Sequence, residues 1–145
     1  MDFFHSIETS SSGLSAQRLR MNLISGNLAN VNTTRTREGG PYRRKEAVFA
    51  AESMNSPFNK ILTNRLNSQF SGVRVDRIYE DQTPPMMKYE PSHPHADEKG
   101  YVAMPNINPM EEMVNMISAT RGFEANVTAL QAAKEMALKA LEIGR

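Results

Sequence analysis

The stretch SGNLANVNTTRT, residues 25–36, decides how the first helix of this chain ends and what its last turns contact. It places Asn27, Asn30 and Asn32 behind a run with apolar residues at helical spacing. Asparagine near a helix end is a stop signal, because it tolerates the left-handed conformation that follows the last turn. This fits Asn30 and Asn32. Asn27 lies inside the run, so we expect its amide to contact a partner surface.

The first 34 residues lack proline and carry apolar side chains on two faces of one predicted helix. The first face consists of Ile7, Leu14, Met21 and Leu28, with Ile24 and Val31 between them. The other face consists of Ala16, Leu19 and Leu23, continued by Asn27 and Asn30. A surface helix of a soluble protein normally has one apolar stripe. The second face therefore predicts a second partner.

The C-terminal segment, residues 106–145, repeats this two-faced pattern. Pro109, with Glu111 and Glu112 in the first turn, favours a helix start, and Gly144 ends the helix. One face consists of Met116, Phe123, Val127, Leu130, Ala137 and Leu141. The other consists of Ala125, Ala129, Ala132, Met136, Ala140 and Ile143, whose small side chains would let another helix approach closely.

The middle segment, residues 35–105, has a different pattern. Alternating residues predict a strand within 72–81, and weaker strand signals cover 41–50 and 86–91. The predicted fold class is α+β: two long terminal helices, 1–34 and 106–145, pair as a coiled coil around a small β-rich insert. Each helix is expected to keep one apolar face uncovered, as an interaction surface.

Composition narrows the function classes. The chain has 145 residues, of which 39% are hydrophobic, and a mean hydropathy of −0.52, so we expect elongated helices and a small core. The net charge of +1 gives no global attraction to nucleic acid or a membrane. There is no cysteine and no long apolar run. The first 13 residues lack the basic and apolar regions of a cleaved secretion signal, so any export is expected to use another route.

The sequence offers one candidate metal cluster, His93, His95, Asp97 and Glu98. Its spacing is poor for a structural zinc site and no cysteine assists. We expect a polar loop bounded by prolines, and no metal or cofactor.

The run Arg43, Arg44 and Lys45 is a candidate nucleic-acid contact. Because Glu38 and Glu46 flank it, a solvated face is the favoured interpretation. Dinucleotide, phosphate-loop and serine-nucleophile motifs are absent from the sequence, so no catalytic residue is predicted.

Two motifs resemble a known family. NLANVNT, residues 27–33, is similar to the N-terminal signature of bacterial flagellar rod and hook proteins, N-[IL]-A-N-x-[NSD]-T. Residues 111–144 resemble their C-terminal helix, in which an Arg, an aromatic residue and E/Q-A-N follow in order. Those residues are here Arg121, Phe123, Glu124, Ala125 and Asn126, with Gly122-Phe123 where the family more often has Ala-Tyr. Residues 39–49 and 87–113 look like those of proximal rod proteins, whereas 51–71 match poorly.

This resemblance to the flagellar basal-body rod protein family implies a structural role. It implies a subunit of the proximal rod that polymerises through its terminal helices into the tubular drive shaft crossing the periplasmic space. The implied partners are copies of the chain, other axial proteins and the flagellar type III export apparatus, which needs no cleaved signal. No nucleic acid or small-molecule substrate is implied. The alternative is a soluble coiled-coil adaptor or export chaperone that binds one partner helix.

The predicted assembly interface follows from the apolar stripes and the motif asparagines. It comprises Leu14, Leu19, Met21, Leu23, Ile24, Asn27, Leu28, Asn30, Val31, Met116, Phe123, Asn126, Val127, Leu130, Ala137 and Leu141.

Overall fold

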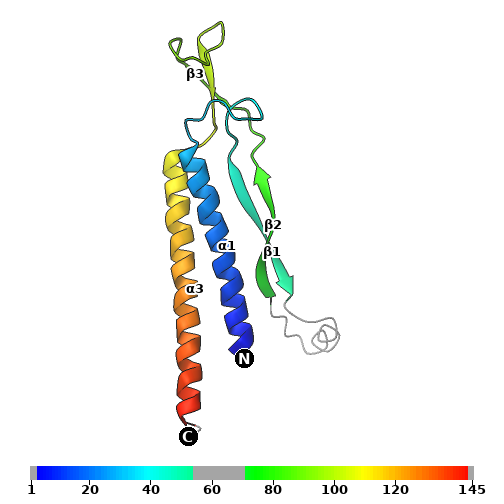
Figure 1. The fold of residues 1–145 in the computed structure, drawn as a ribbon, viewed down its shortest axis with the longest axis vertical. Helices are drawn as coiled ribbons and strands as arrows, with labels where there is room; N and C mark the ends of the chain where they lie inside the picture. The colour runs from blue at the N-terminus through cyan, green and yellow to red at the C-terminus, as the bar shows by residue number, and fades with distance from the viewer. Residues whose placement is uncertain (1–2, 54–70, 144–145) are drawn as a thin grey trace.

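The computed structural model describes residues 3–53 and 71–143 of the chain. The elements in chain order are α1 (Phe3–Ala29), β1 (Lys45–Ser53), β2 (Ser71–Glu80), β3 (Met86–Tyr89), β4 (Tyr101–Met104) and α3 (Pro109–Ile143). Figure 1 shows an elongated molecule in which the two helices lie side by side, the β1–β2 hairpin runs along α1, and the β3–β4 hairpin stands beyond the helix ends. The predicted α+β class, with two terminal helices and a β-rich middle, is confirmed.

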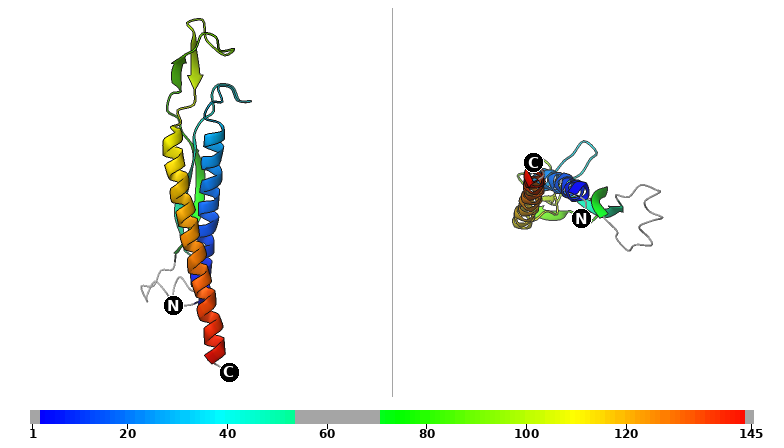
Figure 2. Two further views of the ribbon diagram at one scale, coloured as in Figure 1. Left: turned by 90° about the vertical axis from the view of Figure 1, so that its left-hand side faces the viewer. Right: turned by 90° about the horizontal axis from the view of Figure 1, so that it is seen from below.

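The two helices run antiparallel, as Figures 1 and 2 show by their colours. Two pairs of residues fix their register: Asn27 bonds to Glu112 at one end of the pair, and Gly13 lies against Asn126 further along. Residue numbers therefore decrease along α3 in the direction in which they increase along α1. A Cβ atom at Gly13 would lie 3.0 Å from Asn126 Nδ2, so the glycine permits this close approach of the two helices.

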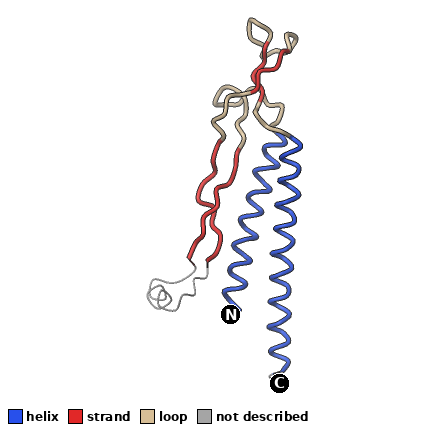
Figure 3. Tube along the Cα trace, turned by 180° about the vertical axis from the view of Figure 1, so that it is seen from behind, coloured by secondary structure: helices blue, strands red, loops and turns tan. Residues whose placement is uncertain are grey.

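The second apolar face of α1 is covered within the chain. Figure 3 shows the β1–β2 hairpin beside α1, and α1 contacts both strands as well as α3. Ser12 Oγ accepts a bond from the Val73 N–H of β2 at 3.1 Å, and Ala16, on the same side of α1, is buried. Leu19 and Leu23 share this side and are half-buried. The expectation of an uncovered apolar face is therefore wrong for α1.

The alanine-rich face of α3 remains open. Among the described elements, α3 contacts α1 alone. The exposed residues of this face are Ala125, Ala129, Ala132, Met136, Ala140 and Ile143. The expectation of an uncovered apolar face is therefore confirmed for α3.

The described strands form two separate antiparallel sheets of two strands each, β1–β2 and β3–β4. The predicted strand at 72–81 is β2, and the weaker signals at 41–50 and 86–91 correspond to β1, which begins later, and β3. β4, Tyr101–Met104, was not predicted. Residues 54–70 of the predicted β-rich middle lie outside the described residues.

The loop between β3 and β4 depends on Gly100. This residue has φ of 79°, which favours glycine, and a Cβ there would lie 2.9 Å from Tyr89 Cε2. The rings of Tyr89 and Tyr101 then meet edge to face, with centroids 5.3 Å apart. The turn thus brings the two ends of the hairpin together beyond the helices.

The apolar core is thin, in agreement with the composition. The buried apolar residues of the described chain are Ala16, Ile24, Val102, Ile107, Ala119 and Ala133. Within the described residues, neither helix combines the length and apolar character that a membrane crossing requires. Much of the stability must therefore come from the α1–α3 seam and from polar contacts between segments.

The close approach at Gly13 gives a test of the helix pair. Gly13→Leu should push α1 from α3 and lower the free energy of unfolding by about 1–3 kcal/mol, as overpacked sites do. Thermal unfolding followed by helical circular dichroism measures the loss. Ser11→Leu, at an exposed position of α1, is the matched control and should change stability little. Equal effects of the two substitutions would contradict the close packing.

Candidate assembly site

The side-chain amide of Asn27 is fully buried, with 1% of its surface exposed, and makes four hydrogen bonds. Its Nδ2 donates to the carbonyl of Lys45 and to Glu112 Oε2, both at 2.9 Å. Its Oδ1 accepts from the backbone N–H of Lys45 at 2.9 Å and from the hydroxyl of Tyr42 at 3.2 Å. An amide has two donors and two acceptor sites, so every one is used. Asn27 thereby joins α1, β1 and α3.

Glu112 is the charged centre of the same cluster. Only 1% of its surface is exposed, and Arg44 Nε donates to its Oε1 at 2.8 Å. Burial lowers the pKa of Arg44, but the bond and the charge of Glu112 outweigh it, so the net pKa of Arg44 is raised. The solvated role predicted for the basic run is therefore wrong for Arg44, which neutralises a buried carboxylate. It holds for Arg43, which is exposed.

Tyr42 and Lys45 complete the cluster, which we call the polar junction: Asn27, Tyr42, Arg44, Lys45 and Glu112. Burial raises the pKa of the Tyr42 phenol, which keeps it a hydrogen-bond donor to Asn27. Lys45 Nζ lies 3.0 Å from Glu80 on the partner strand, and this bond raises the pKa of Lys45. The junction therefore ties the end of α1 and the start of α3 to the first residue pair of the β1–β2 hairpin.

The other two asparagines of the opening stretch have local roles. Asn30 Nδ2 donates to the Gly26 carbonyl at 2.8 Å, and Asn30 Oδ1 accepts from Thr33 Oγ1 at 3.1 Å. The backbone N–H of Asn30 also donates to the Gly26 carbonyl, at 3.1 Å, so Asn30 closes the last turn of α1 with both its backbone and its side chain. Asn32 lies exposed in the following turn. Asn30 is thus the first residue after α1, where a helix end was predicted, and the turn role predicted for Asn32 is confirmed.

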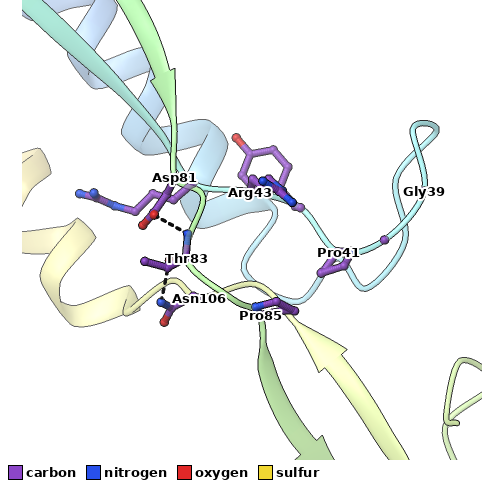
Figure 4. Close-up of a pocket in the computed structure, with 10 residues that line it drawn as sticks. Gly39, Pro41, Arg43, Asp81, Thr83, Pro85 and Asn106 are labelled. Atoms are coloured by element: carbon purple, nitrogen blue, oxygen red, sulfur yellow. Dashed lines mark hydrogen bonds between the residues drawn. The ribbon is translucent and has the colours of Figure 1, made fainter.

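A second set of hydrogen bonds links the two hairpins above the helices (Figure 4). The Thr83 N–H donates to Asp81 Oδ1 at 2.9 Å, a bond that lowers the pKa of Asp81, and Asn106 Nδ2 donates to Thr83 Oγ1 at 3.1 Å. They border a cavity of about 120 Å³, which Pro41 and Pro85 also line. These contacts orient the β3–β4 hairpin on the loop that follows β2.

His93 and His95 lie in a polar loop between β3 and β4, as expected. His95 Nδ1 is 2.8 Å from Thr34 Oγ1, and the His93 and His95 rings stack edge to face. Asp97 Oδ1 accepts from the backbone N–H groups of Lys99 and Tyr101, so its role is to close the turn. Within residues 3–53 and 71–143, no group of three or more potential ligands is placed to hold a metal ion.

Two apolar patches on α3 are exposed. The upper ridge consists of Met110, Met113, Val114 and Ile117, with 68%, 44%, 65% and 54% of their surfaces exposed. At the other end of the helix pair, the lower groove is an open apolar hollow of about 660 Å³ lined by Phe3, Ser6, Ala133, Met136, Ala137, Ala140 and Leu141. Both patches lie where neighbouring molecules could reach them.

The predicted interface residues lie mostly along the α1–α3 seam. Ile24 and Asn27 are buried within the chain, and Leu141 is 71% exposed. The half-buried ones are Leu14, Leu19, Met21, Leu23, Leu28, Asn30, Val31, Met116, Phe123, Asn126, Val127, Leu130 and Ala137. Their role in assembly stays a prediction. In the structure, the Asn27 amide makes all of its hydrogen bonds to residues of its own chain.

The upper ridge was missed, although the sequence contains its signal. Its positions are i, i+3, i+4 and i+7, the spacing of one helical face. The partners of Asn27 carried no such signal, because Lys45 and Glu112 lie 18 and 85 residues away in the chain.

Comparison with known proteins gives full-length relatives. A chain of Borreliella burgdorferi named flagellar basal-body rod protein FlgC is 47% identical over 99% of this chain and 98% of its own length. Proteins of the same name from Bacillus subtilis and Escherichia coli O6:H1 are 44% and 37% identical over the whole of both chains. The chain belongs to the FlgC family of flagellar basal-body rod proteins. It is accordingly a structural subunit of the flagellar rod, with its place in the basal body.

Two family models also match this FlgC-family chain. The one described as flagella basal body rod protein covers residues 7–35, which include Asn27 and Asn30. The one described as flagellar basal body rod FlgEFG protein C-terminal covers residues 98–143, which include Glu112, the upper ridge and the α3 part of the lower groove. The two matched segments thus meet physically at the bond between Asn27 and Glu112.

Asn27→Leu tests the amide at the junction. Leucine has a similar size but leaves the Lys45 backbone groups and Glu112 Oε2 without partners, and each unsatisfied buried group costs about 1–3 kcal/mol. We expect urea unfolding to give a free energy lower by at least about 2 kcal/mol. Asn22→Leu, at an exposed position of the same helix, is the control. A loss no larger than that of the control would contradict the role given to Asn27.

Glu112→Gln tests the charge at the junction. Arg44 would lose its buried counter-ion, and breaking a buried pair costs about 3–5 kcal/mol. Because Arg44 is 23% exposed and water screens its charge, we expect a smaller loss, about 2–3 kcal/mol, in denaturant unfolding. Glu111→Gln removes an exposed carboxylate from the neighbouring position and should change little. Equal losses would show that the burial of Glu112 carries no energetic weight.

Proposed function

We propose that this rod subunit belongs to the proximal rod and polymerises through its paired terminal helices into the tubular shaft. The observation that carries the proposal is the one-sided packing of α3, which contacts α1 alone among the described elements. Its upper ridge and its alanine-rich face are left to solvent in the single chain. Exposed apolar surface of this extent is typical of a protein interaction site.

The pairing of α1 and α3 is proposed to be a coiled coil. Ile7, Leu14, Met21 and Leu28 recur at every seventh position, the repeat that favours supercoiling. Met21 Sδ accepts a bond from Thr120 Oγ1 of α3 at 3.7 Å, so this stripe lies on the α3 side of α1. A paired unit of this kind would act as one stiff building block of the tube wall.

The partners proposed are copies of the chain and other rod proteins. An adaptor or export chaperone that binds one helix needs a single open surface. This chain has the upper ridge at one end of α3 and the lower groove at the other, and the open alanine-rich face runs into the groove at Met136 and Ala140. Two contact surfaces at opposite ends of the helix favour an assembly subunit over the adaptor alternative.

The relation to flagellar rod proteins also supports a proposal for how the chain is exported and where the assembled subunit lies. We propose that the flagellar type III apparatus exports the chain with no signal cleaved, and that the assembled subunit contributes to the rod as it crosses the periplasm. We also propose that the chain has no enzymatic activity, in keeping with the structural names of its relatives.

Val114→Asp separates assembly from folding. Val114 is 65% exposed in the single chain, so the free energy of unfolding should change by less than about 0.5 kcal/mol. In a packed rod the same carboxylate would be buried without a partner and would block growth. Cells that depend on the variant should therefore contain few complete basal bodies when these are counted by electron microscopy.

Two controls accompany this variant. Gln131→Asp adds the same carboxylate to an exposed polar strip of α3 and should leave basal bodies near the normal number. Ile24→Asp, at a residue only 5% exposed, should instead lower the stability of the isolated chain by about 3–5 kcal/mol, as an unpaired buried charge does. Normal rods with Val114→Asp would mean that this part of α3 is not packed during assembly.

A further inference from the structure

Two glycines of the helix pair each face an amide side chain of the opposite helix. A Cβ atom at Gly13 of α1 would lie 3.0 Å from Asn126 Nδ2 and 3.2 Å from Asn126 Cγ and Oδ1. A Cβ atom at Gly122 of α3 would lie 3.2 Å from Gln17 Nε2 and 3.3 Å from Gln17 Cδ. Each glycine is therefore a notch in its helix, and the amide of the other helix takes up the space that a side chain would need.

The two contacts are reciprocal. α1 contributes one notch, Gly13, and one amide, Gln17, four residues later. α3 likewise contributes the notch Gly122 and the amide Asn126, again four residues apart. Residues at this spacing lie on one face of a helix, one turn from each other. Because the two helices are antiparallel, the notch of each helix meets the amide of the other.

The notches share their register with the polar junction. Gln17 is ten residues before Asn27, and Gly122 is ten residues after Glu112, the partner of Asn27. The heptad repeat of the apolar stripe on α1 would also suit an alignment shifted by seven residues. That shift would place Ala129 opposite Gln17, and the methyl group would then occupy the room that the amide needs. The amides therefore fit their notches in the alignment that the junction also requires.

Gln17 is held in its notch by fit, because its oxygen makes no hydrogen bond. Gln17 Oε1 is buried and has no hydrogen-bond partner among the described residues, whereas Asn126 Nδ2 donates to the Gly122 carbonyl at 3.0 Å. A buried acceptor without a partner lowers stability. A polar side chain buried between paired helices can nevertheless set their register at a cost in stability. Gln17 has both properties of such a residue.

We propose that Gln17 determines how closely and in which alignment α1 and α3 pack, with Gly122 as its matched notch and the pair of Gly13 and Asn126 as its reciprocal counterpart. This role belongs to the fold of the single chain and does not rest on how the rod is assembled. Its consequence is that the effect of a side chain at position 122 depends on the side chain at position 17.

A cycle of Gly122→Ala and Gln17→Ala tests the matched pair by urea unfolding. In the Gln17→Ala chain the new methyl group meets no amide, and the higher helix propensity of alanine should raise the urea midpoint. In the unmodified chain Gly122→Ala should raise the midpoint less, or lower it, because Gln17 must move.

The control cycle uses Arg18→Ala in place of Gln17→Ala. Arg18 is the exposed neighbour of Gln17 on α1, so its removal should leave the effect of Gly122→Ala as it is in the unmodified chain. Equal effects of Gly122→Ala in the unmodified, Gln17→Ala and Arg18→Ala chains would overturn the matched pair.

Gln17→Met separates fit from hydrogen bonding, and it leaves both notches in place. Methionine is also long and unbranched, so it fills the notch at Gly122 without a buried oxygen that lacks a partner. We expect a urea midpoint above that of the unmodified chain. A midpoint below it would show that the amide of Gln17 stabilises the pair by bonding, against the role given to its fit.

A distance between two spin labels reports the packing of the helices, which a change in stability alone would not move. The labels are attached to Ser11→Cys and Thr128→Cys, at exposed positions of α1 and α3, in a chain that has no cysteine of its own. Gly122→Ala should lengthen or broaden the measured distance, and Gln17→Ala in the same chain should restore it. A distance that Gly122→Ala leaves unchanged, or that Gln17→Ala fails to restore, would refute the positioning role of Gln17.

Discussion

The buried bond between Asn27 and Glu112 is the interaction on which the arrangement of the terminal helices depends. An amide and a carboxylate removed from water are stable only if their polar atoms find partners. Here those partners are the Lys45 backbone, Tyr42 and Arg44. These partners lie within residues 42–45, Asn27 belongs to α1 and Glu112 to α3, so the cluster is satisfied only when α1, the start of β1 and α3 meet in one register. The thin apolar core tolerates many similar alignments of two long helices, whereas this polar junction accepts one.

This constraint gives the two helices different roles. α1 is held between α3 and the β1–β2 hairpin, so both of its apolar faces serve the fold of the single chain. α3 is held from one side only, and its other faces are available to neighbours. Substitutions of the same chemistry should therefore act differently on the two helices: a charge at Ile24 acts on folding, and a charge at Val114 acts on what the folded chain can bind.

Features that depend on neighbouring residues could be predicted from the sequence, whereas contacts between residues far apart in the chain could not. Both helices, three of the four described strands, the end of α1 before Asn30 and the start of α3 at Pro109 follow from periodicity and turn chemistry within a few residues. The partners of Asn27 and the ion pair of Arg44 could not be predicted, because they join residues 18 to 85 positions apart. The same reason explains the error about α1: its two stripes were read correctly, but nothing local says that a hairpin of the same chain covers one of them. The residues predicted for assembly follow these stripes, and their role between subunits stays a prediction.

The length of α3 connects the junction to assembly. Glu112 fixes the start of this helix beside α1 and Asn126 packs against Gly13 further along, so the position of the far end of this stiff helix follows from these two contacts. The upper ridge lies next to the anchor and the lower groove lies beyond Ala133, so the junction sets where both patches are presented. A loosened junction would change the angle of α3 in every copy, and the error would accumulate with each added subunit. The buried asparagine in the opening motif would thus serve the assembly without contacting a neighbour, by keeping one helix in place.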